Sequence, residues 1–310
     1  MQLLRFEHDE LLQPCVATIG FFDGIHLGHR YLIRQVCEVA DQWGYKAAVV
    51  TFPVHPRQIV RYKPDFKLLT TWEEKLSILS DSGLDYCIAL DFTEKLAALS
   101  AKDFMLFLKN DFNVKVLLVG YDHRFGHNRS EGFADYVKYG EELGIKVLLN
   151  EVYKTDENEV ISSSLIRNSL LLGKVSDAAK LLGYNYYLEG IVVSGRQLGR
   201  QIGYPTANLK VDSPDKIIPA DGVYAVWVTI DGKRYGGMLS IGVRPTVNNG
   251  TDRTIETHIF NFDSDIYGKM IRISFVSYIR PEEKFGTLDE LIAQLHKDAE
   301  VTTHILELAT

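Results

Sequence analysis

The sequence predicts an α/β domain with a doubly wound parallel sheet, followed by an antiparallel β-barrel with a closing helix. In the first half, about five short, continuously apolar runs alternate with amphipathic stretches, as in strands that helices cover on both faces. Beyond Tyr187 the apolar pattern becomes short and alternating with closely spaced turns, which indicates a barrel. The 310 residues suffice for both domains, which we place at 1–183 and 187–310.

The elements of the first domain follow from apolar spacing and from helix-capping residues. Strands are expected over 15–19, 45–52, 85–90, 114–119 and 145–149. Helices are expected after His29, from Thr70 or Thr71 to Leu79, from Ser100 through Leu108, from the serines at 162–164 and over 175–182. Because ligands bind such sheets at the carboxyl ends of strands, Gly20, Thr51 and Gly120 bring three candidate motifs to one edge.

The second domain shows hairpin spacing. Asp231-Gly232 is a hairpin signal between strands expected over 222–230 and 235–241. Two more strands are expected over 254–262 and 269–279. A closing helix is expected to bury one apolar face, formed by Leu288, Leu291, Ile292 and Leu295.

Composition excludes several classes of protein. Hydrophobic residues make up 46% and charged residues 24%, which is typical of globular domains. With a net charge of −7, no general basic surface is expected, so nucleic acid and anionic membranes are not expected as partners. Cys15, Cys37 and Cys87 lack metal-ligand spacing and are expected to be reduced thiols. No signal core or apolar run of membrane-spanning length is present, so we expect a cytoplasmic protein.

The segment Ala17–His29 carries the first motif, between the first long apolar strand and the helix after it. Gly20, Gly24 and Gly28 allow a sharp turn, and His26 and His29, three residues apart, share a face of the helix. Free amides and the helix dipole favour an anion there, and imidazoles can donate to phosphate oxygens. The alternative is an ordinary strand-to-helix turn with two surface histidines.

Two further loops add candidates to the same edge, and a third loop with candidate residues follows later in the chain. His55 lies beyond a strand in the segment Thr51–Pro56, Asp122 could bind a ribose or base edge, and Arg124 a phosphate. In the third loop, Ser162, Ser163 and Arg167 stand at a helix start, where they could hold a triphosphate. Each of these segments also has a plain interpretation, as a connecting loop or a capped helix.

The segment Gly20–His29, Gly-Phe-Phe-Asp-Gly-Ile-His-Leu-Gly-His, resembles the His-x-Gly-His signature of nucleotidyltransferases, in the form found in bacterial bifunctional riboflavin kinase/FMN adenylyltransferases. Ile161-Ser-Ser-Ser-Leu-Ile-Arg167 resembles a second motif of that family. The resemblance implies that His26 and His29 stabilise the attacked α-phosphate and Arg167 the leaving pyrophosphate. It also implies binding roles for Gly20, Phe21, Asp23, Gly28, Asp122, Arg124, Ser162 and Ser163. His123 departs from the family, which commonly has an aromatic residue there, and the order of residues in 51–56 is rearranged.

The segment Gly199–Asn208, Gly-Arg-Gln-Ile-Gly-Tyr-Pro-Thr-Ala-Asn, resembles the riboflavin kinase signature, although composition alone also fits a flexible loop. The resemblance implies Mg²⁺ ligation by Thr206 and Asn208 beside ATP, and contacts from Gly195, Gly199, Arg200 and Gly203. It makes Glu256 the base for the ribityl hydroxyl. Ile255 and Thr257 lie on the opposite face of the strand from Glu256, which we expect to face the barrel interior, where a charge is costly unless it is used. The alternative is a solvated glutamate on the outer face of the strand. The resemblance also implies that Arg280 and Phe285 line the flavin pocket.

Together these features predict an enzyme that phosphorylates riboflavin to FMN and then adenylylates FMN to FAD, with ATP as co-substrate and Mg²⁺ at both sites. One alternative is an adenylyltransferase for another phosphate-bearing substrate, such as a pantetheine phosphate or nicotinamide mononucleotide. The barrel signature argues against it. The other alternative is a non-catalytic flavin or nucleotide sensor, which would bind without turning over ATP. The joint presence of His26, His29, Arg167, Thr206, Asn208 and Glu256 argues against a sensor.

Overall fold

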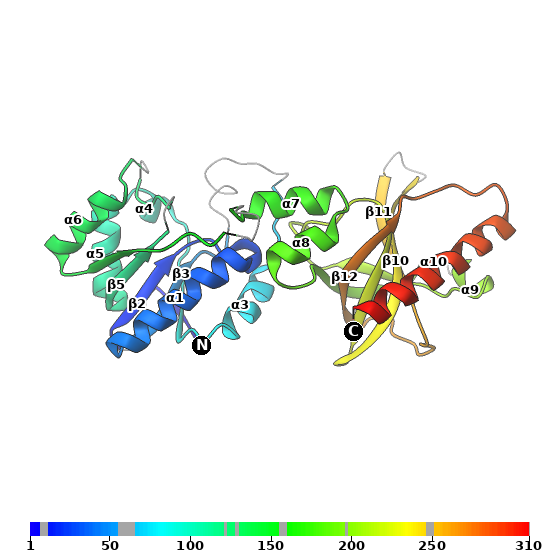
Figure 1. Ribbon diagram of the computed structural model, residues 1–310, viewed down its shortest axis with the longest axis horizontal. Helices are drawn as coiled ribbons and strands as arrows, with labels where there is room; N and C mark the ends of the chain where they lie inside the picture. Colours follow the sequence, from blue (N-terminus) through cyan, green and yellow to red (C-terminus); the bar gives the residue numbers. More distant parts are fainter. Residues whose placement is uncertain are drawn as a thin grey trace. The chain divides into compact units, whose positions relative to one another are not determined.

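The computed structural model describes residues 1–6, 12–54, 66–120, 123–127, 130–154, 160–195, 198–245 and 251–309. The chain forms two compact units, Met1–Ser163 and Ser164–Thr310, which are described separately below (Figure 1). This division falls before the boundary expected near 183–187. Helices α7 (Ser163–Leu171) and α8 (Val175–Leu182) therefore belong largely to the second unit, where Ser176 Oγ donates to the Val276 carbonyl at 3.0 Å.

The first unit is built on a parallel sheet with the strand order β1-β4-β3-β2-β5-β6. The strands are β1 (Gln2–Arg5), β2 (Cys15–Ile19), β3 (Lys46–Thr51), β4 (Tyr86–Ala89), β5 (Val114–Val119) and β6 (Lys146–Leu149). Strand β1 was not expected, because it is short and only Leu4 in it is buried. The chain moves from β2 to β3 and β4 in one direction and to β5 and β6 in the other. The strand order thus reverses between β2 and β5, where open α/β sheets bind ligands.

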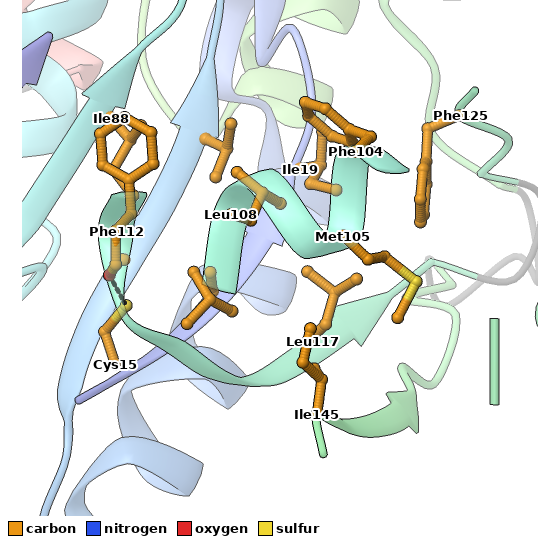
Figure 2. Close-up of a cluster of buried hydrophobic side chains, with 14 of the residues drawn as sticks. Cys15, Ile19, Ile88, Phe104, Met105, Leu108, Phe112, Leu117, Phe125 and Ile145 are labelled. Carbon is orange, nitrogen blue, oxygen red and sulfur yellow. Dashed lines mark hydrogen bonds between the residues drawn. The ribbon is translucent and has the colours of Figure 1, made fainter. Parts of the chain in front are cut away.

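Helices cover both faces of this sheet, which confirms the doubly wound arrangement. They are α1 (Leu27–Trp43), α3 (Trp72–Ser80), α4 (Glu94–Ala97), α5 (Ala101–Phe112) and α6 (Phe133–Leu143). On one face Ile33 and Val36 of α1 pack with Val16 and Val49 of the sheet. Figure 2 shows the cluster on the other face, where side chains of α5 pack against Ile19 and Leu117.

Both faces being covered explains why the strands are continuously apolar. Every residue of β2 is buried, and the Cys15 thiol donates to the Phe112 carbonyl at 3.4 Å (Figure 2). Burial raises the pKa of Cys15 to about 12 and that of Cys87 to about 11, so both thiols stay protonated. All three cysteines, including the half-buried Cys37, are free.

The second unit contains a closed antiparallel barrel, which confirms the predicted architecture, and its strand order is β10-β11-β8-β7-β12-β9. The strands are β7 (Tyr187–Val193), β8 (Ala207–Val211), β9 (Gly222–Ile230), β10 (Lys233–Pro245), β11 (Thr251–Ile259) and β12 (Met270–Arg280). Asp231 (φ 47°) and Gly232 (φ 77°) both adopt the left-handed conformation that a two-residue type I′ hairpin requires. Tyr224 and Phe275 fill the interior of the barrel and are fully buried.

The closing helix is α10 (Leu288–Leu308), and it packs on β9, β10 and β12. Its capping box pairs Thr287 with Glu290. The expected apolar face is only partly correct, because Leu288 is 59% exposed and the buried positions lie further along, at Asp298, Thr302 and Leu306.

A buried ion pair ties α10 to the barrel. The Arg280 guanidinium donates to the Asp298 carboxylate from Nε at 3.0 Å and from Nη2 at 2.8 Å, and Asp298 is 3% exposed. Gln294 also donates to this carboxylate, at 2.9 Å.

We expect Asp298→Ala to lower the stability of the barrel unit by about 3–5 kcal/mol, because it leaves a largely buried guanidinium without its carboxylate. Hydrogen exchange of the slowest barrel amides in the full chain measures this loss. Lys269→Ala is the matched control. Its pair with Asp231 is exposed, so the loss should stay below about 1 kcal/mol. Equal small losses in the two variants would contradict a stabilising role for the Arg280–Asp298 pair.

Candidate active sites

A strained turn links β2 to α1 at the carboxyl end of β2. Gly20 N donates to the Val50 carbonyl at 3.0 Å, and the chain then enters the short 3-10 helix η1 (Asp23–Ile25). Phe22 (φ 56°), Gly24 (φ 78°) and Ile25 (φ 37°) all have left-handed backbones. Only Gly24 adopts this conformation without steric strain, and for the β-branched Ile25 it is an outlier. Surrounding interactions must therefore hold the turn in place.

Asp23 provides the most direct of these interactions. Its side chain is 3% exposed, and Oδ1 accepts from Leu69 N at 3.0 Å and from Thr70 N at 3.2 Å. Thr70 Oγ1 in turn accepts from Gly24 N at 3.1 Å. The carboxylate is thus directed into the segment before α3, and Asp23 shapes the turn.

The two histidines follow this turn and stack on each other, with ring centroids 3.6 Å apart. His26 caps α1, and its Nδ1 accepts from His29 N at 3.3 Å. Neutral His26 must therefore carry its proton on Nε2. Burial lowers the pKa of His26 to about 4. Burial, followed by the charges of His26 and Lys75, holds the pKa of His29 well below its usual range. Both imidazoles are neutral at pH 7.

The start of α1 offers backbone donors beside these rings. His29 N bonds to the His26 side chain and Arg30 N to the His26 carbonyl, at 3.0 Å. Within the described part of the chain, the amides of Leu27 and Gly28 and Nδ1 of His29 have no hydrogen-bond partner. Free amides at a helix N-terminus bind anions, and here they lie at the strand-order reversal.

Other predicted residues reach the same edge of the sheet. Thr51 Oγ1 donates to the Phe21 carbonyl at 3.2 Å, and Ser163 Oγ to the Asp23 carbonyl at 3.0 Å, so the β3 end and the serine motif both meet the turn. Ser162 is exposed. His55 and Asp122 lie outside the described residues.

The loop after β5 and the start of α7 hold the remaining predicted residues of this site. Arg124 is half-buried and donates to the His123 carbonyl at 3.2 Å. Phe125 fixes this loop by stacking on Tyr136, with centroids 4.1 Å apart. Arg167 belongs to the second compact unit, where it is half-buried on α7.

The second site lies on the outer face of the barrel. Glu256 of β11 stands opposite Asn208 of β8 on one side and Ser240 of β10 on the other. The prediction that Glu256 faces the interior was wrong. Its neighbours Ile255 (4% exposed) and Thr257 (0%) line the interior, and side chains alternate along a strand, so Glu256 is half-buried on the outer face.

The signature segment lies against this outer face. Thr206 Oγ1 donates to Glu256 Oε2 at 3.3 Å. Gly195 packs on Asn208, because a Cβ at Gly195 would lie 2.3 Å from the Asn208 amide nitrogen. Arg200 on α9 (Leu198–Gln201) is exposed, as is Gly203, and Gly199 lies against the Tyr204 carbonyl. One patch of side-chain oxygens that could serve as metal ligands thus contains Thr206, Asn208 and Glu256. We call it the barrel patch.

Several residues around the barrel patch were not predicted. The Tyr204 hydroxyl lies 2.7 Å from His296 Nδ1, and His258 Nδ1 lies 2.8 Å from the Pro205 carbonyl. Ser240 Oγ donates to Glu282 at 2.9 Å. The position of His258, two residues from Glu256 on one strand, could have shown that they share a face. The other contacts are long-range and leave no local signal.

Arg280 does not present its guanidinium as a free group, because it is bonded to Asp298 and to the Pro281 carbonyl. Phe285 lies 5.7 Å from the guanidinium carbon. Among the described residues, no cluster of three or more His, Cys, Asp or Glu side chains could hold a metal ion. A cation at the barrel patch would therefore rely on few protein ligands.

Two family models match the chain, FAD synthetase over residues 8–165 and riboflavin kinase over residues 182–306. Relatives described as bifunctional riboflavin kinase/FMN adenylyltransferase occur in Haemophilus influenzae (36% identity, 97% of each chain) and Escherichia coli K12 (36%, 96% of each). Another from Listeria monocytogenes is 35% identical over 93% of this chain and 91% of its own.

A solved structure described as a macrolide-efflux protein from Streptococcus pneumoniae is also similar. It is 33% identical, with a TM-score of 0.90 over 97% of this chain and 98% of its own. The efflux description applies to that protein. In the described part of this chain, no helix combines the length and apolar character needed to cross a membrane.

The buried histidines should make the first unit sensitive to acid. An unfolded histidine binds a proton near pH 6.5, whereas folded His26 does so only near pH 4. Between these values the unfolded state holds more protons, so stability falls as pH falls, by about 3 kcal/mol for His26. We expect His26→Asn, which keeps a capping oxygen, to reduce the pH slope of unfolding measured by hydrogen exchange of unit 1 amides. His304→Asn, at an exposed histidine, is the control, and an unchanged slope in His26→Asn would contradict the assignment.

Proposed function

The chain belongs to the family of bifunctional riboflavin kinase/FMN adenylyltransferases, and we propose that each unit carries one active site. The family's two reactions, riboflavin with ATP to FMN and FMN with ATP to FAD, are those of this chain. In the proposal, the domain that carries His26 and His29 transfers AMP, and the domain that carries the barrel patch transfers the γ-phosphate. The matched ranges 8–165 and 182–306 support an adenylyltransferase domain within 1–183 and a kinase domain within 187–310.

One observation carries the first assignment: two free amides at the start of α1 lie beside two neutral, stacked imidazoles. In adenylyl transfer, an FMN phosphate oxygen attacks the α-phosphorus of ATP. A new P–O bond forms, and the bond to the β-phosphate breaks and leaves its electron pair on pyrophosphate. Since the nucleophile is already an anion, the site needs no strong base. Positioning and charge stabilisation suffice.

The protonation state of His26 defines its role in this step. Its Nδ1 accepts from His29 N, so Nε2–H is available to donate to a phosphate oxygen. His29 stabilises the same α-phosphate. The likeness of the segment Ile161–Arg167 to the family motif assigns Arg167, with Ser162 and Ser163, to the leaving pyrophosphate. Gly20, Phe21, Gly28, Asp122 and Arg124 contact nucleotide or flavin, and Asp23 acts by holding the turn.

In the second reaction Glu256 accepts the proton of the ribityl hydroxyl as that oxygen attacks the γ-phosphorus and ADP leaves. The hydroxyl of Thr206 donates to Glu256 and so orients the carboxylate. Gly195, Gly199 and Gly203 give the signature segment room near the phosphates, where Arg200 adds charge. Phe285 lines the flavin pocket. Arg280 contributes to this pocket by holding α10 in place through its bonds to Asp298.

The donor set of the barrel patch fits Mg²⁺. Thr206 and Asn208 offer neutral oxygens and Glu256 a carboxylate, and Mg²⁺ in phosphoryl-transfer sites takes few protein ligands beside phosphates and water. Thr206 and Asn208 would hold the ion, which neutralises charge on the ATP phosphates when bound. We also propose Mg²⁺ with ATP at the first site. The three free thiols support a reducing compartment, the cytoplasm.

For the adenylyltransferase, we expect His29→Ala to lower FAD formation from supplied FMN by about 10²-fold or more, since it removes stabilisation of the transition state. FMN formation from riboflavin in the same protein should persist, and it serves as the internal control. Chromatography of both reactions with ATP and Mg²⁺ gives the two rates. Undiminished adenylylation would refute the role of His29.

For the kinase, Glu256→Gln should lower FMN formation by about 10²- to 10⁴-fold, because the amide cannot accept the proton. FAD formation from supplied FMN should be unchanged. Glu307→Gln, at an exposed position on α10, is the control and should leave both rates as they are. Equal loss of both activities in Glu256→Gln would indicate a folding defect and would count against the assignment.

A further inference from the structure

Lys75, in the first turns of α3, is a buried lysine that the proposed mechanism does not use. Its side chain is 1% exposed. Nζ lies 3.5 Å from the centroid of the Phe21 ring and donates to the Phe52 carbonyl at 3.3 Å. Within the described ranges it forms no salt bridge with a carboxylate. Buried ammonium groups are costly unless paired, so this arrangement calls for an explanation.

The contacts of Lys75 lie at the ends of two neighbouring strands. Phe21 follows β2 and Phe52 follows β3, and Thr51 joins the two ends by donating to the Phe21 carbonyl. The ammonium therefore ties α3 to both strand ends at once. It does so directly before the strained turn that leads to His26.

The segment before Lys75 holds the same turn from its other side. Leu69 N and Thr70 N donate to Asp23, and Thr70 Oγ1 accepts from Gly24 N. Residues 69–75 thus hold the turn at two places. Leu69 and Thr70 form hydrogen bonds with η1, and the Lys75 ammonium contacts the Phe21 ring. Without the ammonium, the turn would lose its link from α3 to Phe21 and would keep the bonds at Asp23 and the bond from Thr51 to the Phe21 carbonyl.

Charged and titratable groups around Lys75 come from three other elements. Asp23 of η1 favours the charged form of Lys75. Cys87 of β4 is a protonated thiol, and His29 of α1 is neutral. Glu74 on α3 itself is bonded to Thr71 N, at the helix cap. Burial outweighs the attraction of Asp23 and lowers the pKa of Lys75 to about 8. The ammonium is therefore charged at pH 7 and loses its proton within the range of ordinary assays.

We propose that Lys75 is a positioning residue for adenylyl transfer, whose charged ammonium, through the Phe21 ring and the Phe52 carbonyl, holds the turn that presents His26 and His29 to the nucleotide phosphates. The inference rests on the proposed role of the histidine pair. Charge is essential because a ring face attracts a cation, and a neutral amine loses that attraction. An apolar side chain would fill the space without desolvating a charge, so the lysine serves more than packing.

The test compares pH profiles of kcat/KM for both reactions in full-length wild type, Lys75→Arg and Lys75→Met. In wild type, adenylylation of FMN should fall as the pH rises through about 8, whereas riboflavin phosphorylation should not. Lys75→Met should be up to about 10²-fold slower in adenylylation at pH 7 and show no such fall. Lys75→Arg keeps its charge at all these pH values, so its kcat/KM for adenylylation should not fall as the pH rises through about 8.

Lys46→Met is the matched control, because Lys46 begins β3 at the amino edge of the same sheet and pairs with Asp85. It should leave the adenylylation profile as in wild type. The phosphates of FMN and ATP are fully ionised above pH 7.5, so they contribute no change near pH 8.

A wild-type rate and profile in Lys75→Met, or an unchanged fall in Lys75→Arg, would overturn the proposal. If Lys75→Met does not fold, the comparison of wild type with Lys75→Arg still decides it. The His29→Ala variant distinguishes a failure of the proposed adenylyltransferase site from a failure of the role proposed for Lys75. Full adenylylation in His29→Ala refutes the proposed site itself, whereas an inactive His29→Ala beside a wild-type Lys75→Met refutes only the role of Lys75.

Discussion

The site in the first unit depends on the buried carboxylate of Asp23. Three residues of the turn from β2 to α1 have left-handed backbones, and two of them, Phe22 and Ile25, are strained there. The bonds from Leu69 N and Thr70 N to Asp23 hold that turn in place. The turn sets where α1 begins, so it also places the His26 cap and the free amides of Leu27 and Gly28. A carboxylate buried against backbone donors thus fixes the position of the candidate anion site at the start of α1.

In the proposed function, the two sites bind phosphate groups with different chemistry. In the first unit, backbone amides and neutral imidazoles gather where the strand order reverses. Burial keeps both imidazoles uncharged, so they act through oriented hydrogen bonds. In the second unit, Thr206, Asn208 and Glu256 gather on the outer face of a closed barrel, whose interior is filled by side chains such as Tyr224 and Phe275. Glu256 on that face is only half-buried.

Features that depend on neighbouring residues were predicted well. The continuous apolar runs at 15–19 and 114–119 indicated strands buried on both faces, and they are β2 and β5. Thr71, left as one of two alternatives, is the cap of α3. Features that depend on distant partners were missed or wrong. Strand β1 carries too little apolar character to be recognised, and the outward direction of Glu256 follows from the burial of Ile255 and Thr257.

By itself, the sequence determined the fold class, the order of the elements and the motifs at the strand ends, because periodicity, caps and turn residues act over a few positions. It also provided the candidate phosphate-binding residues. Only the tertiary structure decided what those groups do. It directed Asp23 into the protein, bound Arg280 to Asp298, made the histidines neutral and placed Lys75 against Phe21. The physical reason is that burial and long-range pairing, which set charge and orientation, arise only when segments far apart in the chain pack together.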